Sequence, residues 1–207
     1  MPTTVAIIGA GPLGRWLALA AARAGFRVLL EDVMPNNLHH AQELLRQELS
    51  PALLRQKFSS KALDTEALPT VTFVSTIEDA VREADLVIDC VPDELESKLE
   101  ILWLLDRMAP PRTVFATPTM HLSIADLANC TYRPEKCIAI AAEASALTGR
   151  AVPAPGSVSP GPPADGATAI LLRTTSRTAP ETVALVRDFW RRLGFVPSFS
   201  ADPAEQK

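Results

Sequence analysis

Short apolar runs rich in valine and isoleucine alternate with segments of helical periodicity along the chain. The hydrophobicity is continuous in runs such as VAII at 5–8 and LVID at 86–89, which is typical of strands buried on both faces of a parallel sheet. The sequence therefore predicts an α/β fold with a doubly wound, mostly parallel sheet covered by helices. The expected strands cover residues 4–8, 27–31, 70–74, 85–90, 113–116, 136–141, 167–173 and 195–199.

Three expected helices carry a recognisable start. In each, a serine or threonine precedes an acid by three residues, so that its hydroxyl can accept a hydrogen bond from a backbone N–H that the helix leaves free. The pairs are Thr76 with Asp79, Ser123 with Asp126, and Thr178 with Glu181.

Two segments interrupt the alternation. After the second strand, a helical excursion runs over 36–49, restarts at Ser50 and Pro51 and continues to about Phe58, which is longer than a minimal crossover. The segment VPAPGSVSPGPPAD at 152–165 is too rich in proline and glycine for a helix or a central strand. We expect a loop or hinge there.

Composition narrows the classes of partner. The 207 residues, 47% hydrophobic and 21% charged, suffice for one sizeable domain. The 20 basic against 24 acidic residues give a net charge of -4 without a basic block, which does not favour nucleic-acid binding. We find neither a targeting leader nor an apolar run near the roughly 20 residues that span a bilayer, and so expect a cytoplasmic protein without membrane contact.

The cysteines Cys90, Cys130 and Cys137 have no CxxC spacing and lie in or beside apolar segments. We therefore expect small buried hydrophobic side chains rather than disulfides, and no metal site.

A glycine motif follows the first expected strand. In VAIIGAGPLG at 5–14, Gly9, Gly11 and Gly14 have G-x-G-x-x-G spacing, with Pro12 and Leu13 opening a helix. The first glycine permits a tight turn, the second lets a pyrophosphate approach the backbone, and the third lets helix and strand pack closely. The free N–H groups of the helix attract the anion. This context predicts a dinucleotide site, although a purely structural glycine turn remains the alternative.

The acid that ends the second strand suggests which dinucleotide binds. Asp32 lies 18 residues past Gly14, where a carboxylate can accept hydrogen bonds from the ribose hydroxyls. Glu31 is one position away. A carboxylate there repels a 2′-phosphate, and no arginine follows it nearby, so NAD is preferred over NADP.

Later segments carry a resemblance to a known family. ADLVIDCVPDELESK at 84–98 is a strand that ends in an acidic turn and a lysine, and it is followed in order by TVFATPTMHLSIADLA, RPEKCIAI and TAPETVALVRDFWRRLGFVPSFSADP. With the helical excursion, these segments resemble the NAD-binding domain of 3-hydroxyacyl-CoA dehydrogenases over nearly the whole chain. The resemblance implies a Rossmann-type domain at 1–200 that binds NAD, with oxidoreductase activity on the CH–OH group of a 3-hydroxyacyl-CoA in fatty acid metabolism. The tail at 201–207 is where the family's helical C-terminal domain would begin, and we expect that domain to be absent.

The resemblance also implies roles for individual residues. Asp32 would hold the adenosine ribose, while Val91, Asp93 and Lys98 would line the nicotinamide half of the site. The turn at Thr117–Thr119 would close the pocket. For Lys98, a solvated lysine on a helix surface is the alternative.

The chain departs from the family where the chemistry takes place. The family's Ser-Asn-Thr-Ser turn is replaced by Thr117-Pro118-Thr119-Met120. The family's next strand ends in His-Phe-Phe-Asn-Pro, whose histidine is the general base and is oriented by a glutamate. Here that place reads Ala141-Ala142-Glu143-Ala144-Ser145. We expect the usual catalytic pair to be missing, and we name His121 and Glu143 as candidates for a rewired site, because both follow strands at their carboxyl ends.

Three interpretations stay open from the sequence. The chain is an oxidoreductase that acts on a different or smaller, acyl-CoA-like molecule, a non-catalytic NAD-binding sensor or interaction module, or a structural relative that binds NAD poorly. We expect a homodimer, because surface that the helical domain covers in the family would otherwise leave apolar side chains exposed near the C-terminal strands or the excursion.

Overall fold

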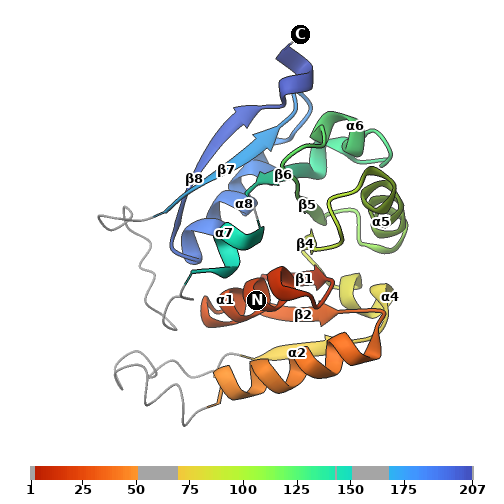
Figure 1. The fold of residues 1–207 in the computed structure, drawn as a ribbon. Coiled ribbons are helices and arrows are strands. Elements are labelled where there is room, and N and C mark those ends of the chain that lie inside the picture. Colours follow the sequence, from red (N-terminus) through yellow and green to blue (C-terminus); the bar gives the residue numbers. More distant parts are fainter. Residues whose placement is uncertain (1–2, 51–69, 143, 151–167, 207) are drawn as a thin grey trace.

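A computed structural model describes residues 3–50, 70–142, 144–150 and 168–206. Along these residues, strands and helices alternate as the hydrophobic pattern predicts (Figure 1). The elements are β1 Thr4–Ile8, α1 Pro12–Arg23, β2 Arg27–Glu31, α2 Pro35–Glu48, β3 Val71–Val74, α4 Ile77–Val81, β4 Leu86–Asp89, α5 Leu95–Met108, β5 Val114–Pro118, α6 Ile124–Ala128, β6 Cys137–Ala141, α7 Ala144–Thr148, β7 Thr168–Thr174, α8 Pro180–Arg192 and β8 Phe195–Ala201, with short 3₁₀ helices at Pro134–Lys136 and Pro203–Gln206.

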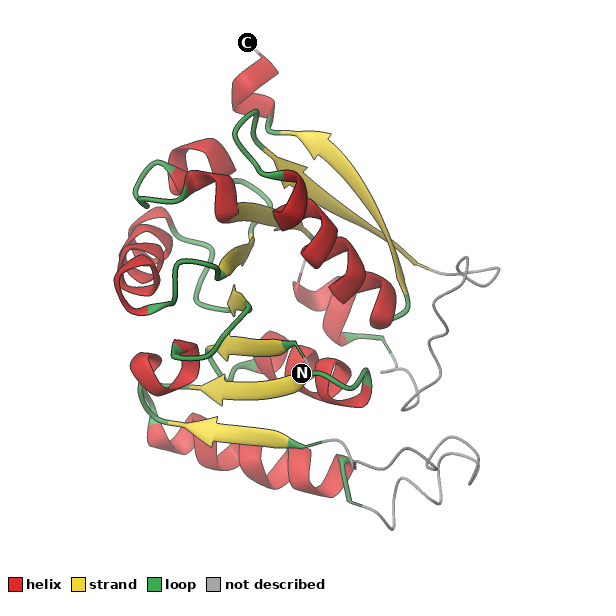
Figure 2. Cartoon of the chain, turned by 180° about the vertical axis from the view of Figure 1, so that it is seen from behind, coloured by secondary structure: helices red, strands yellow, loops and turns green. Residues whose placement is uncertain are grey.

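The strands form one sheet with the order β3-β2-β1-β4-β5-β6-β7-β8. Pairing is parallel throughout except between β6 and β7. Figure 2 shows β3, β2 and β1 at one end of the sheet and the long β7 and β8 at the other. The predicted doubly wound, mostly parallel, Rossmann-like sheet is confirmed.

Two apolar clusters cover the two faces of the sheet, because successive residues of a strand point to opposite sides. Ile7 and Ile88 join α1, α7 and α8 in one cluster. Ile8 and Val87 join α4, α5 and α6 in the other, and these three helices lie together on one side (Figure 1). Each strand in the centre is therefore buried on both faces, as its continuous hydrophobicity indicates.

Two of the three predicted helix starts are confirmed. The hydroxyls of Thr76 and Ser123 each accept a hydrogen bond of 3.2 Å from the backbone N–H three residues later. The prediction for Thr178 is wrong, because α8 begins one residue later, with Ala179 at its N-cap and no side-chain cap. The hydroxyl of Thr178 instead accepts a bond of 2.9 Å from the N–H of Thr175 and closes the preceding turn.

The two interruptions fall largely outside the described residues. The first part of the excursion is α2, Pro35–Glu48, whereas its restart at 51–58 and the proline-rich segment at 152–165 are not described. Within the described ranges, no helix is both long and apolar enough to cross a bilayer.

Candidate functional site

The carboxyl ends of β1, β2, β4 and β5 meet along one edge of the sheet, on both sides of β1. Strand β1 lies between β2 and β4, so the strand order reverses at this point, which is where open α/β sheets bind ligands. The N–H of Gly9 donates to the carbonyl of Glu31 at 2.8 Å, and the N–H of Cys90 donates to the carbonyl of Ile8 at 2.7 Å. These bonds hold the glycine turn between its two neighbouring strands.

The three glycines occupy three different environments. Gly9 has φ of 101°, a left-handed conformation that strongly favours glycine. A Cβ on Gly14 would lie 1.8 Å from the carbonyl oxygen of Gly9, so no side chain fits there. A Cβ on Gly11 would meet nothing within 4 Å. The space beside Gly11 is thus open, as a backbone that receives a pyrophosphate requires.

Within the part of the chain that the structure describes, no side chain caps the start of α1. Gly11 is its N-cap and makes no side-chain cap bond, the exposed Pro12 occupies the first turn, and that turn has no acid. Leu13 packs against the core and fixes the helix on the sheet. The positive end of the helix therefore faces the open space beside Gly11, and an anion is stabilised there.

Asp32 lies directly beside this turn and is 8% exposed. Its Oδ2 accepts a hydrogen bond of 2.8 Å from the N–H of Ala10, and its Oδ1 accepts one of 2.8 Å from the N–H of Met34. The amide of Asn37 approaches both oxygens at 3.3 and 3.4 Å. A carboxylate offers about four acceptor positions, and the contacts from Asn37 are long, so a ribose hydroxyl can take the place of one of them.

These features fit the phosphate and ribose of a dinucleotide, and comparison with known proteins identifies the family. Residues 4–141 match the family model described as the NAD binding domain of 3-hydroxyacyl-CoA dehydrogenase. The chain belongs to the 3-hydroxyacyl-CoA dehydrogenase family. The predicted family and its cofactor, NAD, are confirmed.

Proteins similar to this chain extend well past its length. The probable 3-hydroxybutyryl-CoA dehydrogenase of Bacillus subtilis strain 168 is 34% identical over 65% of this chain and 46% of its own length. The 5-formyl-3-hydroxy-2-methylpyridine 4-carboxylate 5-dehydrogenase of Mesorhizobium japonicum is 30% identical over 95% of this chain and 57% of its own. The chain thus spans about half the length of these relatives.

Two solved structures share the fold of this chain. A crystal structure of 5-formyl-3-hydroxy-2-methylpyridine 4-carboxylic acid 5-dehydrogenase, described as an NAD+ dependent dismutase, has a TM-score of 0.71 at 28% identity and covers 98% of this chain and 59% of that one. A diketoreductase structure has a TM-score of 0.74 at 26% identity, covering 96% and 64%.

By the family resemblance, the nicotinamide half of the cofactor would lie over β4 and β5. The residues predicted to line that half differ in how deeply they are buried. Val91 is half-buried and packs against the apolar cluster that includes α4, α5 and α6. Asp93 is exposed, and its Oδ2 accepts a bond of 3.1 Å from the N–H of Met120. Thr117 is 1% exposed. Asp93 therefore joins the turn after β4 to the turn after β5.

Lys98 is not the solvated helix lysine that the sequence left open. Its side chain is 0% exposed, and its Nζ lies 2.5 Å from Oδ1 of Asp89, the last residue of β4. Burial raises the pKa of Asp89 above its ordinary value, and the nearby ammonium opposes that rise. The pair lies beneath the turn after β4 rather than on the surface of the site.

Of the two catalytic candidates, the structure describes only His121. His121 is exposed in the loop between β5 and α6, and Glu143 lies outside the described residues. Strand β6 ends at Ala141 beside Leu171 of β7, so the expected alanine does stand at the strand's end. A methyl group cannot transfer a proton, and this position therefore supplies no acid or base.

Asp202 is a residue near the site that sequence reasoning missed. It is 1% exposed, and its Oδ2 accepts bonds of 3.0 Å from Ser123 Oγ and 2.8 Å from the N–H of Ala125. Burial opposes its ionisation, but hydrogen bonds from Ala204, Ala125 and Ser123 lower the pKa of Asp202. It fastens the end of β8 to the start of α6, which begins three residues after His121, and only an Asp-Pro pair marks it in the sequence.

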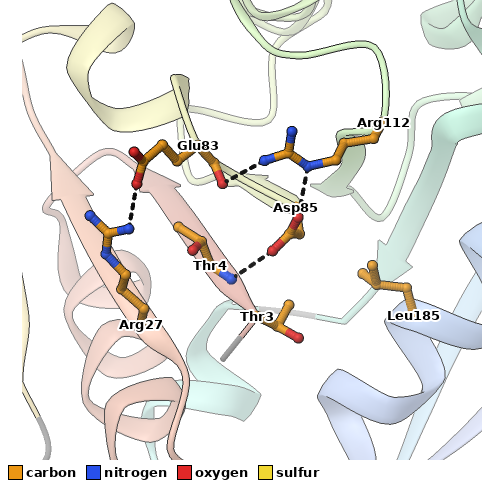
Figure 3. Close-up of a pocket in the computed structure, with 7 residues that line it drawn as sticks. All are labelled: Thr3, Thr4, Arg27, Glu83, Asp85, Arg112 and Leu185. Atoms are coloured by element: carbon orange, nitrogen blue, oxygen red, sulfur yellow. Dashed lines mark hydrogen bonds and ion pairs between the residues drawn. The ribbon is translucent and has the colours of Figure 1, made fainter. Parts of the chain in front are cut away.

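A separate hollow of about 760 Å³ lies at the opposite edge of the sheet, where the strands begin. Figure 3 shows that its charged side chains pair within the wall: Arg27 with Glu83, and Arg112 Nε with Asp85 Oδ1 at 3.0 Å. Its lining consists of Thr3, Thr4, Arg27, Glu83, Asp85, Arg112 and Leu185. Because the glycine turn and Asp32 are at the other edge, this hollow is no part of the NAD site.

Proposed function

We propose that this chain provides the NAD(H)-binding half of a 3-hydroxyacyl-CoA dehydrogenase-type oxidoreductase and has little or no proton-transfer capacity of its own. The observation that carries the proposal is the contrast along one edge of the sheet. The turn at Gly11 is open and Asp32 is poised beside it, whereas β6 ends in Ala141. This edge of the sheet thus keeps the groups that bind the cofactor but has no acid or base at the end of β6.

Binding follows from the contacts at the turn. The free N–H groups at the start of α1 bind the pyrophosphate, and Asp32 accepts hydrogen bonds from the adenosine ribose while repelling a 2′-phosphate. The bound nicotinamide supplies hydride transfer. Residues at the ends of β4 and β5, among them Val91 and Asp93, would hold that ring.

The substrate that we propose is an acyl-CoA-like or smaller hydroxy or carbonyl compound. Two kinds of relative support this range: a 3-hydroxybutyryl-CoA dehydrogenase and a dehydrogenase of a pyridine carboxylate. The second aligns with 95% of this chain and the first with 65%, which favours the smaller substrate.

A non-catalytic NAD-binding sensor or interaction module is the second candidate. The missing acid or base at Ala141 favours it, because removing a general base costs on the order of 10²–10⁴ in rate.

Two measurements test these candidates. Calorimetric titration with NADH, NAD+ and NADPH should show binding that prefers the non-phosphorylated forms, and failure to bind any dinucleotide would contradict both candidates. Reduction of acetoacetyl-CoA, followed by loss of NADH absorbance, then separates them. A measurable trace rate favours the oxidoreductase, and no turnover above buffer favours the sensor.

A further inference from the structure

Asp89 and Lys98 form an ion pair that is sealed from solvent under the proposed nicotinamide half. Both side chains are at most 1% exposed, and their charged atoms lie 2.5 Å apart. Asp89 is the last residue of β4, and Lys98 comes from the first turns of α5. Taking two charges out of water is costly, so such a pair is a weak source of stability.

The pair lies close to the glycine turn. Asp89 is paired in register with Ile8, the residue that precedes Gly9. A Cβ on Gly9 would lie 3.2 Å from the carbonyl oxygen of Cys90, the neighbour of Asp89. Gly9 and Cys90 follow these two strands at the edge where a dinucleotide would pass from β1 to β4. The ion pair therefore lies one residue before that edge.

The second oxygen of Asp89 is still available. Asp89 Oδ2 and Thr117 Oγ1 are buried and have no hydrogen-bond partner of normal geometry among the described residues, although Thr117 is near enough to lower the pKa of Asp89. Lys98 is thus the positive charge that balances Asp89 among the described residues.

Few other charges face the pair. Asp93 in the turn after β4 acts on Asp89 through its negative charge. The thiol of Cys90 stays neutral, because burial and then the charge of Asp89 raise its pKa. From β1 the neighbour is Ile8, and from β5 it is Thr117, and neither carries a charge.

The two forms of the cofactor differ in charge at the ring. The nicotinamide ring is positive in NAD+ and neutral in NADH, so a fixed charge nearby changes the affinity of one form only. Charges interact more strongly in a buried environment than in water. An unpaired Lys98 would repel NAD+, and an unpaired Asp89 would attract it.

We propose that the Asp89–Lys98 pair sets the relative affinity of the site for NAD+ and NADH by cancelling both charges beneath the nicotinamide ring. This inference rests on the proposed NAD(H) binding. Asp89 acts as a positioning and charge-balancing residue rather than a catalytic one.

The test uses Asp89→Asn, Lys98→Met and the double variant of the full chain. Dissociation constants for NAD+ and NADH are measured by calorimetry from pH 5.5 to 9. Asp89→Asn should weaken NAD+ relative to NADH on the order of tenfold, most strongly at low pH, where the lone amine is protonated. Lys98→Met should change the ratio of the NAD+ and NADH dissociation constants in the opposite direction, most strongly at high pH, where the lone carboxyl is ionised.

The double variant removes both charges and should return the ratio to within about threefold of the unmodified protein, because opposite charge effects cancel. A matched control is Asp106→Asn, which breaks the pair of Asp106 with Arg133, 2.6 Å apart, near the other end of α5. It should lower stability and leave the ratio unchanged.

Each single variant is judged at the end of the pH range where its remaining group is charged: low pH for Asp89→Asn and high pH for Lys98→Met. A ratio that stays within twofold of the unmodified protein at that end, in a variant that thermal unfolding shows to be folded there, would overturn the inference. Shifts of the same sign in both single variants would overturn it too. If the unmodified chain binds neither dinucleotide, the proposed function itself fails.

Discussion

Asp32 Oδ2 accepts a hydrogen bond of 2.8 Å from the backbone N–H of Ala10, in the middle of the glycine turn. The acid that the sequence assigns to the cofactor's ribose thus also fixes the turn that approaches the pyrophosphate. Under the proposed NAD binding, one carboxylate therefore binds the ribose and also fixes the turn that receives the pyrophosphate.

Asp32→Ala should therefore weaken NAD by roughly 1–3 kcal/mol, through loss of charge-assisted hydrogen bonds and loosening of the turn. The affinity for NADP should fall less, because the repulsion of the 2′-phosphate is removed. Calorimetric titration of both cofactors measures the change. Asn37→Ala, which removes only the longer contacts to Asp32, serves as the control and should preserve the preference. Equal affinities of the unmodified protein for NAD and NADP would contradict the assignment of Asp32 to the ribose.

Gly11 and Gly14 should respond differently to the same substitution. A Cβ at position 11 would meet no atom within 4 Å, and Gly11 does not have a positive φ. The melting temperature of Gly11→Ala should therefore change little, while its affinity for NADH falls at least tenfold. Gly14→Ala places a methyl group 1.8 Å from the Gly9 carbonyl oxygen, so folding itself should be impaired. Thermal unfolding and NADH titration separate the effects. Tight NADH binding by Gly11→Ala would place the pyrophosphate elsewhere.

The raised pKa of Glu31 makes the free energy of unfolding depend on pH. Burial, and then the negative charge of Asp32, raise the pKa of Glu31 from 4.5 to about 7. A raised pKa in the folded state contributes stability that is fully present below pH 4.5 and is lost as pH rises through 7. Glu31→Gln should thus match the unmodified protein near pH 4 and exceed its stability at pH 8 by up to about 3 kcal/mol. Urea unfolding at both pH values checks this, and an equal difference at both would contradict it.

The sheet and the turn could be predicted from sequence because their signals are local. The first two strands match their expected bounds, Thr4–Ile8 and Arg27–Glu31, since continuous hydrophobicity and the glycine spacing act over a few residues. The positive φ of Gly9 and the crowding at Gly14 follow from the same motif.

Other features depend on how the elements pack against one another and on which of two local contacts a side chain makes. The burial of Lys98 requires Asp89 on the neighbouring strand, and no periodicity separates a buried paired lysine from a solvated one. Asp202 caps a helix that begins 78 positions earlier, next to Ser123. Thr178 resembles a helix cap locally but is used by the turn of Thr175 instead.

Association into a homodimer remains a prediction. Large exposed apolar side chains include Leu44 on α2 and Leu171 on β7, the regions expected from sequence, but α5 carries three: Leu95, Trp103 and Met108. Exposed apolar patches usually mark interfaces, so Trp103→Ser should weaken the dimer more than Leu171→Ser does. Light scattering over a wide concentration range measures this, and a monomer at every concentration would count against the prediction.

The end of β6 carries the sharpest prediction about chemistry. With Ala141 at that position, the chain should bind NADH yet reduce a 3-ketoacyl-CoA at no better than a trace rate, because binding positions the cofactor but no group there delivers the proton. Ala141→His alone should restore little, since catalytic groups act as a unit.

His121→Ala then separates the remaining alternatives. His121 is exposed at the carboxyl end of β5, in a loop held by the bond from the Met120 N–H to Asp93 and by that from Arg173 to the Met120 carbonyl at 3.1 Å. If the protein only binds NAD, the substitution should change neither NADH affinity nor background turnover. If His121 serves as a rewired acid, activity on the active substrate should disappear while NADH affinity is kept. Robust acetoacetyl-CoA reduction that survives His121→Ala would contradict both alternatives and require a proton donor outside β6 and this loop.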